Sequence, residues 1–329
     1  MPDEVIDKAP PANATDKAIP VVHDGTPVRF AVLDVGTNSV KFHIGALEAD
    51  GSWTAIADRA VVTRLGTNLD GGHISDAALE RTVEAIAGMV AEAKENGVRD
   101  MAAVGTAVFR IAANAGEALA AIRERTGVRI EVLSGEEEAR LAYLATIVAL
   151  GSTVGRTVVF DTGGGSSQFT FGHGGAIDER FSVNVGAARY TDRFGLAGSV
   201  SGDVLRQAMA AIADDLSCLD GRPAPDILVG MGGALTNMIA VALGLAEYDR
   251  ARVQGATVTS DEIDEQIEAY RSKDADARRR IIGLQPMRAE VILAGACIVR
   301  TIMRKLGKDA LIVSDKGVRH GVLAERFGN

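Results

Sequence analysis

Two short segments of this chain combine residue types that can hold phosphate and a metal ion. AVLDVGTNSVKFHIG covers residues 31–45, and VVFDTGGGSSQFTFG covers residues 158–172. In each segment an apolar strand leads into Asp-x-Gly and a turn of small polar residues. Glycine-rich turns let backbone N–H groups approach an anion, and a neighbouring aspartate can hold Mg2+ through its water shell. Phosphate together with a divalent cation is therefore the ligand that this pattern favours.

The two segments are copies of one design, offset by 127 residues. The chemically informative residues recur as pairs: Asp34 and Asp161, Gly36 and Gly163, Ser39 and Ser166. Asp and Gly also begin ordinary β-turns, and for one hairpin alone that interpretation would suffice. Two copies in register favour facing loops from two related domains, which would place two carboxylates and two anion-binding turns across one cleft.

A third segment, SGEEEARLAYLA at residues 134–145, could supply a catalytic base. Ser134 and Glu137 form an S-x-x-E capping box, which gives Glu137 a structural role. Glu136 lies in the first turn of the helix, where its negative charge interacts favourably with the helix dipole. Glu138 instead shares a helical face with the apolar residues three, four and seven positions further on. The spacing leaves two interpretations of Glu138 open: a buried ion pair, or a water-activating base whose pKa is raised by burial.

Two further segments could bind an anion. In GTAVFR, residues 105–110, a strand runs into a polar turn followed by Arg110, whose planar guanidinium suits a phosphate, although an arginine there can equally be a surface residue. Gly230, Gly232 and Gly233 stand where a strand meets a helix. That position fits either an anion seat at a helix N-terminus or tight packing of helix on strand.

Other chemistries lack support in the sequence. It contains no G-x-x-x-x-G-K-[ST], no G-x-G-x-x-G opening a helix and no G-x-S-x-G. The five histidines show no ligand spacing, so we expect no zinc site and a structural role for His43. Cys218 and Cys297 lie in apolar helical patterns without a CxxC spacing. We expect both to be reduced core residues, which suits the cytoplasm.

Length, composition and charge limit the classes of protein to which this chain can belong. A chain of 329 residues with 47% hydrophobic and 24% charged residues predicts two globular domains. The net charge of -9 disfavours nucleic-acid and membrane partners, so any polyanion must be held by a local patch. No apolar stretch reaches the roughly 20 residues that span a bilayer. Residues 1–28 hold five of the eight prolines and no signal-peptide core, which predicts a disordered leader.

The elements that must position these residues alternate between strands and helices, so the predicted fold class is α/β. Each half opens with three strands followed by a helix. The predicted strands are Phe30–Asp34, Lys41–Leu47 and Trp53–Thr63 in the first half, and Thr157–Asp161, Gln168–Phe171 and Ala176–Val183 in the second. A helix after Ser134 carries Glu138, and a long helix from Met287 precedes a last strand at Ala310–Ser314 and a terminal helix.

Taken together, the motifs resemble the exopolyphosphatase and guanosine-pentaphosphate phosphohydrolase family, in the superfamily of acetate and sugar kinases, heat-shock chaperone ATPases and actin. The likeness runs from about Phe30 to Leu323. It rests on LDVGTNSVKFHIG, RLG, GTAVFR, LSGEEEARL, VVFDTGGGSSQF, VGMGGALTN, RAEVILAG and VSDKGVRHGVL, in this order. The resemblance implies two ribonuclease-H-like (actin-like ATPase) domains facing a central cleft, with residues 29–142 plus 307–329 in one domain and 143–306 in the other.

The resemblance also implies roles for individual residues. Asp34 and Asp161 would serve Mg2+, with Mn2+ as an alternative, Arg110 would hold the terminal phosphate, and Glu138 would be the catalytic base. The implied phosphate-binding residues are Gly36, Thr37, Asn38, Ser39, Lys41, Gly163, Gly164, Gly165, Ser166, Gly232 and Gly233. In the third turn Ala234 stands where the family usually has Thr. The role of that altered turn stays open.

The implied activity is hydrolysis of the terminal phosphoanhydride of inorganic polyphosphate by a Glu-activated water. Guanosine pentaphosphate is the alternative substrate, an ATP-dependent kinase of the same fold is a more distant alternative, and a non-catalytic nucleotide or polyphosphate sensor is a third. The HD-type C-terminal domain of longer family members is not found before Asn329, so we expect a preference for short chains. Exposed apolar helices also allow a homodimer.

Overall fold

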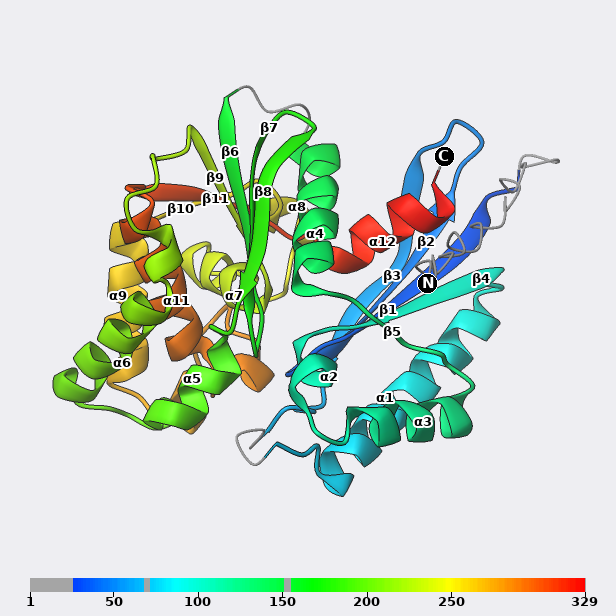
Figure 1. The fold of residues 1–329 in the computed structure, drawn as a ribbon, viewed down its shortest axis with the longest axis horizontal. Helices are drawn as coiled ribbons and strands as arrows, with labels where there is room; N and C mark the ends of the chain where they lie inside the picture. Colours follow the sequence, from blue (N-terminus) through cyan, green and yellow to red (C-terminus); the bar gives the residue numbers. More distant parts are fainter. Residues whose placement is uncertain (1–25, 68–71, 151–154, 329) are drawn as a thin grey trace, which may run out of the picture.

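The computed structural model describes residues 26–67, 72–150 and 155–328. These residues form two mixed β-sheets that lie side by side with helices around and between them (Figure 1). The first strand, β1 (Val28–Val35), begins where the predicted leader ends. Residues 1–25 of that leader lie outside the described residues.

The first sheet has the strand order β3-β2-β1-β4-β5. β2 is antiparallel to both of its neighbours, while β4 is parallel to β1 and to β5. Its further strands are β2 (Ser39–Leu47), β3 (Trp53–Val62), β4 (Asp100–Gly105) and β5 (Glu131–Val132). The helices of this half are α1 (Asp76–Glu95), α2 (Ala107–Ile111) and α3 (Ala115–Thr126).

The second sheet repeats this topology in the order β8-β7-β6-β9-β11-β10. β7 is antiparallel to β6 and β8, β9 is parallel to β6 and β11, and β10 is an additional antiparallel edge strand. The strands are β6 (Arg156–Thr162), β7 (Ser167–His173), β8 (Ala176–Val183), β9 (Ile227–Met231), β10 (Thr257–Thr259) and β11 (Ala310–Ser314). The internal repeat in the sequence is therefore a repeat of strand order and direction.

Most of the remaining helices belong to the second half of the molecule. They are α5 (Ala187–Phe194), α6 (Gly202–Asp215), α7 (Gly233–Ala242), α8 (Arg250–Val253), α9 (Ser260–Arg271), α10 (Ala275–Arg278) and α11 (Ile292–Lys305). Single 3-10 turns lie at Ser217–Leu219 and Pro286–Arg288. Within the ranges described, no helix is both long enough and apolar enough to cross a membrane.

Three sequence-based expectations need correction. The domain boundary predicted at residue 307 assigns Ala310–Ser314 to the first domain, but this strand pairs with β9 and β10 in the second sheet. Only the helix after it packs on the first sheet. The helix expected from Met287 begins at Ile292, because a 3-10 turn at Pro286–Arg288 precedes it. Cys218 is exposed, not part of the core. The other domain boundaries stay predictions.

Two helices, α4 (Gly135–Leu150) and α12 (Val318–Phe327), lie between the two sheets (Figure 1). They pack on each other, α4 against β6, β7 and β8, and α12 against β1 and β2. Together with the inner faces of both sheets they form one apolar cluster, which includes Val32, Leu141, Val159 and Val322. The two halves therefore share a core.

The pleat of each central strand decides which side chains face this shared core. In β1, Leu33 belongs to the outer cluster of the first half, whereas Val32 belongs to the inner cluster. Asp34 has the parity of Val32 and points inward. In β6, Phe160 packs outward and Val159 inward, so Asp161 points inward as well. Strand alternation thus aims both aspartates at the space between the sheets.

The contact of α12 with α4 gives a test of this arrangement. A Cβ added at Gly321 would lie 2.2 Å from the carbonyl oxygen of Leu141 in α4. Gly321→Ala should therefore lower the free energy of unfolding by about 1–3 kcal/mol, the cost of overpacking, although alanine is normally the better helix former. Urea unfolding followed by circular dichroism measures the change.

Gly88→Ala in α1 is the matched control, because nothing lies within 4 Å of an added Cβ there. It should raise the free energy of unfolding by about 0.5–1 kcal/mol. If both variants are stabilised alike, the close approach of α12 to α4 is wrong.

Candidate active site

The turns that join β1 to β2 and β6 to β7 have the same hydrogen bond. The Gly36 N–H donates to the Ser39 carbonyl at 3.0 Å, and the Gly163 N–H donates to the Ser166 carbonyl at 2.9 Å. The two turns also touch, because a Cβ added at Gly165 would lie 2.7 Å from the Thr37 hydroxyl oxygen. A larger residue than glycine would push the turns apart, so the facing loops expected from the repeat meet directly.

These turns line one cleft, which we call the proximal chamber. Its wall includes both Asp34 and Asp161, so the two carboxylates share one crevice. The residues predicted to bind phosphate or metal that line it are Asp34, Gly36, Thr37, Asn38, Ser39, Lys41, Asp161, Gly163, Gly164, Gly165, Ser166, Gly232 and Gly233. Glu138 lines it too, whereas Arg110 is absent from the wall and reaches it through Glu138. The roles of these residues stay predictions.

Glu138 lies on the buried face of α4, as the helical spacing predicts. It is 5% exposed, while Glu136 is exposed and Glu137 is half-buried. The Arg110 Nη1 donates to Glu138 Oε2 at 2.5 Å and to the Leu133 carbonyl at 2.7 Å. Burial raises the pKa of Glu138 to about 8, although the Arg110 charge opposes this. The residue thus has an ion-pair partner and also a pKa in the range of a general base.

The capping box at the start of α4 is formed only in part. The Glu137 N–H donates to the Ser134 hydroxyl at 3.1 Å, as expected. The Glu137 carboxylate, however, pairs with Arg140 one helical turn further on. Glu137 therefore has a structural partner that keeps it away from the cleft.

The segment before Arg110 differs from its prediction. Residues 107–111 form the short helix α2 where a polar turn was expected, with Thr106 at its N-cap. This helix turns the Arg110 side chain back toward the start of α4. Thr106 and Ala107 become part of the chamber wall, although neither was predicted from the sequence to belong to the site. Their position directly after a buried strand was the available signal.

Lysine and aspartate side chains set the charge at the floor of the chamber. Lys41 lies opposite Asp34 in the β1–β2 register, with its Nζ 3.2 Å from Asp34 Oδ2, and this carboxylate raises the pKa of Lys41. Asp161 lies opposite Gln168 in the equivalent register. No described side chain pairs with the Asp161 carboxylate, and burial raises its pKa. Gln168, also in the wall, could have been found from the repeat as the counterpart of Lys41.

The donor set of the two aspartates fits a hard cation. Both carboxylates are buried near the ends of β1 and β6, next to the turns that face each other, and Asp161 has no ion-pair partner in the described part of the chain. Mg2+ prefers carboxylate and water oxygens and often binds through one or two carboxylates plus substrate phosphates. A buried carboxylate without a partner is costly unless a cation joins it. The residues present therefore suit Mg2+.

The third glycine turn, between β9 and α7, is tightly constrained. Gly232 has a φ of +103°, and a Cβ there would lie 2.5 Å from the Thr162 carbonyl oxygen. Ala234 packs on α11, where a Cβ added at Gly295 would lie 2.5 Å from the Ala234 Cβ. This contact accounts for a small residue at position 234. Thr236 bonds to the Gly232 carbonyl at 3.4 Å, within its own helix.

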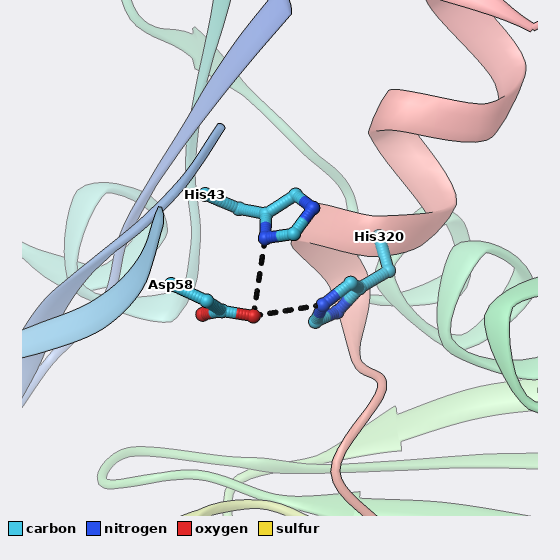
Figure 2. A group of neighbouring side chains, drawn as sticks. All are labelled: His43, Asp58 and His320. Atoms are coloured by element: carbon cyan, nitrogen blue, oxygen red, sulfur yellow. Dashed lines mark hydrogen bonds and ion pairs between the residues drawn. The ribbon is translucent and has the colours of Figure 1, made fainter. Parts of the chain in front are cut away.

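Two histidines that are far apart in the sequence meet beside the cleft. Figure 2 shows His43 on β2 and His320 on α12, both turned toward the carboxylate of Asp58 on β3. One possible ligand atom from each lies within 4.8 Å of the others. The histidines show no ligand spacing in the sequence because this grouping exists only in the tertiary structure.

The hydrogen bonds of this group favour a structural network over a metal site. The Gly317 N–H donates to His320 Nδ1 at 3.1 Å, so His320 Nε2 carries the proton and donates to Asp58 at 3.0 Å. A protonated Nε2 has no lone pair for a metal. Burial lowers the pKa of both His43 and His320, which keeps them neutral. Asp58 is the acceptor that holds the group together.

Paired Asp-Gly turns that face each other between two sheets of one topology define the actin-like class of phosphoryl-processing folds. A Ppx/GppA phosphatase family model matches residues 46–329. The chain belongs to the Ppx/GppA phosphatase family, and it is therefore a phosphatase. This confirms the expected family and fold class.

Individual relatives agree with this assignment. The chain is 27% identical to exopolyphosphatase 1 of Mycobacterium tuberculosis over 312 residues, covering 91% of this chain and 88% of that protein. A solved Ppx/GppA family member from Aquifex aeolicus has 30% identity and a TM-score of 0.77, covering 91% of this chain and 97% of that one.

Another relative is a bifunctional 3-dehydroquinate synthase/phosphatase of Fusobacterium nucleatum. The identity is 25% over 311 residues, and the match covers 91% of this chain. The chain spans 46%, about half, of that relative's length.

The raised pKa of Glu138 predicts the pH dependence of activity. A base must be deprotonated to accept a proton, so kcat/KM should rise with pH through a midpoint near the Glu138 pKa of about 8. Arg110→Met removes the cation that stabilises the carboxylate and should move the midpoint to higher pH. Initial rates of phosphate release between pH 5 and 10 measure both midpoints. A profile that is flat across this range would contradict the role of Glu138 as the titrating base.

Proposed function

We propose that this protein is an exopolyphosphatase, which releases the terminal phosphate of inorganic polyphosphate by hydrolysis. The observation that carries the proposal is the proximal chamber, where two phosphate-type turns, two inward aspartates and a buried glutamate meet. The family supports a phosphatase, and the relatives named exopolyphosphatase support this substrate.

The proposed reaction needs no covalent intermediate. An oxygen of water attacks the terminal phosphorus, the bond between that phosphorus and the bridging oxygen breaks, and the products are orthophosphate and a chain shorter by one unit. Glu138 takes a proton from the attacking water. The backbone N–H groups of the two turns and the Arg110 guanidinium position the terminal phosphoryl group, because positioning and electrostatic stabilisation supply most of such catalysis.

Because Arg110 pairs with Glu138, binding of the substrate would also change the environment of the catalytic base. Arg110 now binds one carboxylate oxygen at 2.5 Å, which masks part of the base. A terminal phosphate carries more charge than a carboxylate and competes for the same guanidinium. Substrate binding then frees Glu138 toward the water while Arg110 remains neutralised.

Asp34 and Asp161 are proposed to hold Mg2+, with Mn2+ as an alternative. When bound, the cation supplies charge neutralisation for the phosphate oxygens, so that an anionic chain can enter an acidic cleft. Lys41, beside Asp34, contributes a fixed positive charge to the same wall. A homodimer and a cytoplasmic location remain part of the proposal.

Glu138→Gln tests the assignment of the base. The amide keeps the shape of the side chain but accepts no proton, so kcat on polyphosphate should fall by about 100-fold or more. Phosphate release measures the rate, and thermal melting shows whether the fold is intact. Glu137→Gln, at the neighbouring half-buried position, is the matched control and should keep the wild-type rate. A well-folded Glu138→Gln enzyme of normal activity would refute the role.

The substrate is tested with one phosphate-release assay. Purified protein is given polyphosphate or guanosine pentaphosphate, each with and without Mg2+. The proposal expects faster release from polyphosphate and loss of release when EDTA removes the cation. Preference for guanosine pentaphosphate would select the alternative substrate. Transfer of phosphate from ATP to a sugar or acid, without release of free phosphate, would point to a kinase, and binding without release would point to a sensor.

Chain length is a separate part of the proposal. The groups that would position the terminal phosphoryl group, Glu138, Arg110 and the two turns, lie together at one place, so contacts with a few terminal units should supply most of the binding energy. We therefore expect kcat/KM for tripolyphosphate to exceed that for chains of several hundred units at equal concentrations of chain ends. Equal kcat/KM values on both would contradict this preference.

A further inference from the structure

Gln168 lies beside Asp161 on the inner face of the second sheet. It is the second residue of β7 and lies directly opposite Asp161 of β6 and Ser182 of β8. Side chains that lie directly opposite one another on neighbouring antiparallel strands share a face of the sheet. Gln168 therefore points into the space between the sheets, where it is 4% exposed and lines the proximal chamber. A buried amide at this position needs hydrogen-bond partners.

The partners of the Gln168 amide are two serine hydroxyls. Its Nε2 donates to Ser166 Oγ at 2.7 Å and to Ser182 Oγ at 3.1 Å. A side-chain amide has two N–H hydrogens, so these bonds use both of them and fix the orientation of the amide. Gln168 thus joins the turn after β6 to the strand β8.

The bond from Gln168 also sets the direction of the Ser166 hydroxyl. Ser166 is buried in the chamber wall, and its carbonyl closes the turn by accepting the Gly163 N–H at 2.9 Å. A serine hydroxyl has one proton to donate and two lone pairs that accept. Because Gln168 occupies a lone pair, the O–H proton of Ser166 is left for an acceptor in the chamber. A charged phosphoryl oxygen is a strong acceptor for such a proton.

The second partner of Gln168, Ser182, lies against the helix that carries the base. A Cβ added at Gly135, the first residue of α4, would lie 2.3 Å from the Ser182 Cβ and 2.7 Å from its Oγ. Glu138 follows three residues later on this helix. Ser182 therefore links the Gln168 amide to the first turn of α4.

The strand β7 makes a second contact with the same part of α4. Thr170, two residues after Gln168 and on the same face, donates its hydroxyl to the Ala139 carbonyl at 2.8 Å. Ala139 is the residue directly after Glu138. The phosphate turn and the catalytic base are thus held by one short stretch of β7.

The equivalent position in the first half of the molecule has a different chemistry. Lys41 lies opposite Asp34 and pairs with it at 3.2 Å. Gln168 is neutral, and its two donors are directed at serines instead of at Asp161. The Asp161 carboxylate is thereby left for a cation, and the amide is left to act on the turn.

We propose that Gln168 is a positioning residue that acts through Ser166. Its amide holds the Ser166 hydroxyl in a fixed position relative to Glu138, with the O–H proton directed at the terminal phosphoryl group. A donor that is held in place before the reaction stabilises the charge developing on the phosphoryl oxygens without reorganisation. The inference rests on the proposed function for the reaction, but not for the choice of substrate, because polyphosphate and guanosine pentaphosphate both present a terminal phosphoryl group.

Gln168→Met tests this role, because methionine keeps the length of the side chain and donates no hydrogen bond. The kcat for phosphate release should fall by about tenfold, and KM should rise by about threefold or less, because a displaced donor costs more in the transition state. The pH midpoint should stay that of wild type, since Arg110 and Glu138 are unchanged. An unchanged kcat, or a shifted midpoint, would overturn the proposal.

Gln266→Met is the matched control for the loss of a buried amide. Gln266 is buried in α9, donates to the Met238 carbonyl at 3.0 Å and does not line the chamber. The variant should keep the wild-type kcat, while thermal melting records its change in stability. A tenfold loss of kcat in this variant too would show that any buried amide has this effect, and the role of Gln168 would be refuted.

A double-mutant comparison separates positioning from a general structural role. Ser166→Ala removes the hydroxyl and should lower kcat by about 100-fold. Adding Gln168→Met should lower it further by about twofold or less, because Gln168 acts through the hydroxyl that is already absent. If Gln168→Met fails to fold, Ser182→Ala takes its place, since it removes one acceptor of the amide. An equal loss of kcat with and without the Ser166 hydroxyl would refute the proposal.

Two substrates and a binding measurement separate this inference from the proposed function. If guanosine pentaphosphate is the better substrate, the exopolyphosphatase proposal fails, and the kcat loss of Gln168→Met should appear on that substrate. If wild-type protein hydrolyses neither, calorimetry should show that tripolyphosphate binds about threefold more weakly to Gln168→Met than to wild type. Equal binding in that case would refute the role of Gln168.

Discussion

The site depends on three buried carboxylates that line one chamber between the two sheets. Asp34, Asp161 and Glu138 line one chamber, and only Lys41 and Arg110 pair with them within the described residues. Removing carboxylates from water favours their protonated forms, and their mutual repulsion adds to this effect. The raised pKa values of Glu138 and Asp161 follow from it. The same shortage of positive charge makes the chamber suited to a divalent cation.

Holding these charges together requires a rigid frame, which the shared core supplies. α4 and α12 pack between the sheets, and the inner faces of β1 and β6 close around them. Glu138 is carried by α4 and His320 by α12, so the helices that join the two halves also carry the polar groups. Catalytic positioning and the stability of the interface therefore depend on the same contacts.

Charge is divided unevenly along the cleft. The proximal chamber is acidic and contains the base, whereas the wall beside it carries the Arg288 guanidinium and two guanidiniums fixed by Asp58, those of Arg250 and Arg319. The net charge of -9 means that a polyanion can be held only where positive charge is concentrated, and this arrangement concentrates it in one wall. A protein with a net negative charge needs a local patch of positive charge to hold a polyanion, and the arginines of this wall carry that charge.

The sequence by itself determined the local features of this protein. The repeat predicted two equivalent turns, strand alternation aims Asp34 and Asp161 to one side, and helical spacing separated buried Glu138 from Glu136 and Glu137. Each of these follows from a period of two or 3.6 residues, which neighbours in the chain reveal. Only the tertiary structure decided which distant residues meet: β11 in the second sheet, His43 with His320 at Asp58, and Arg288 beside Gly233. Such contacts depend on how whole elements pack, and no local period records them.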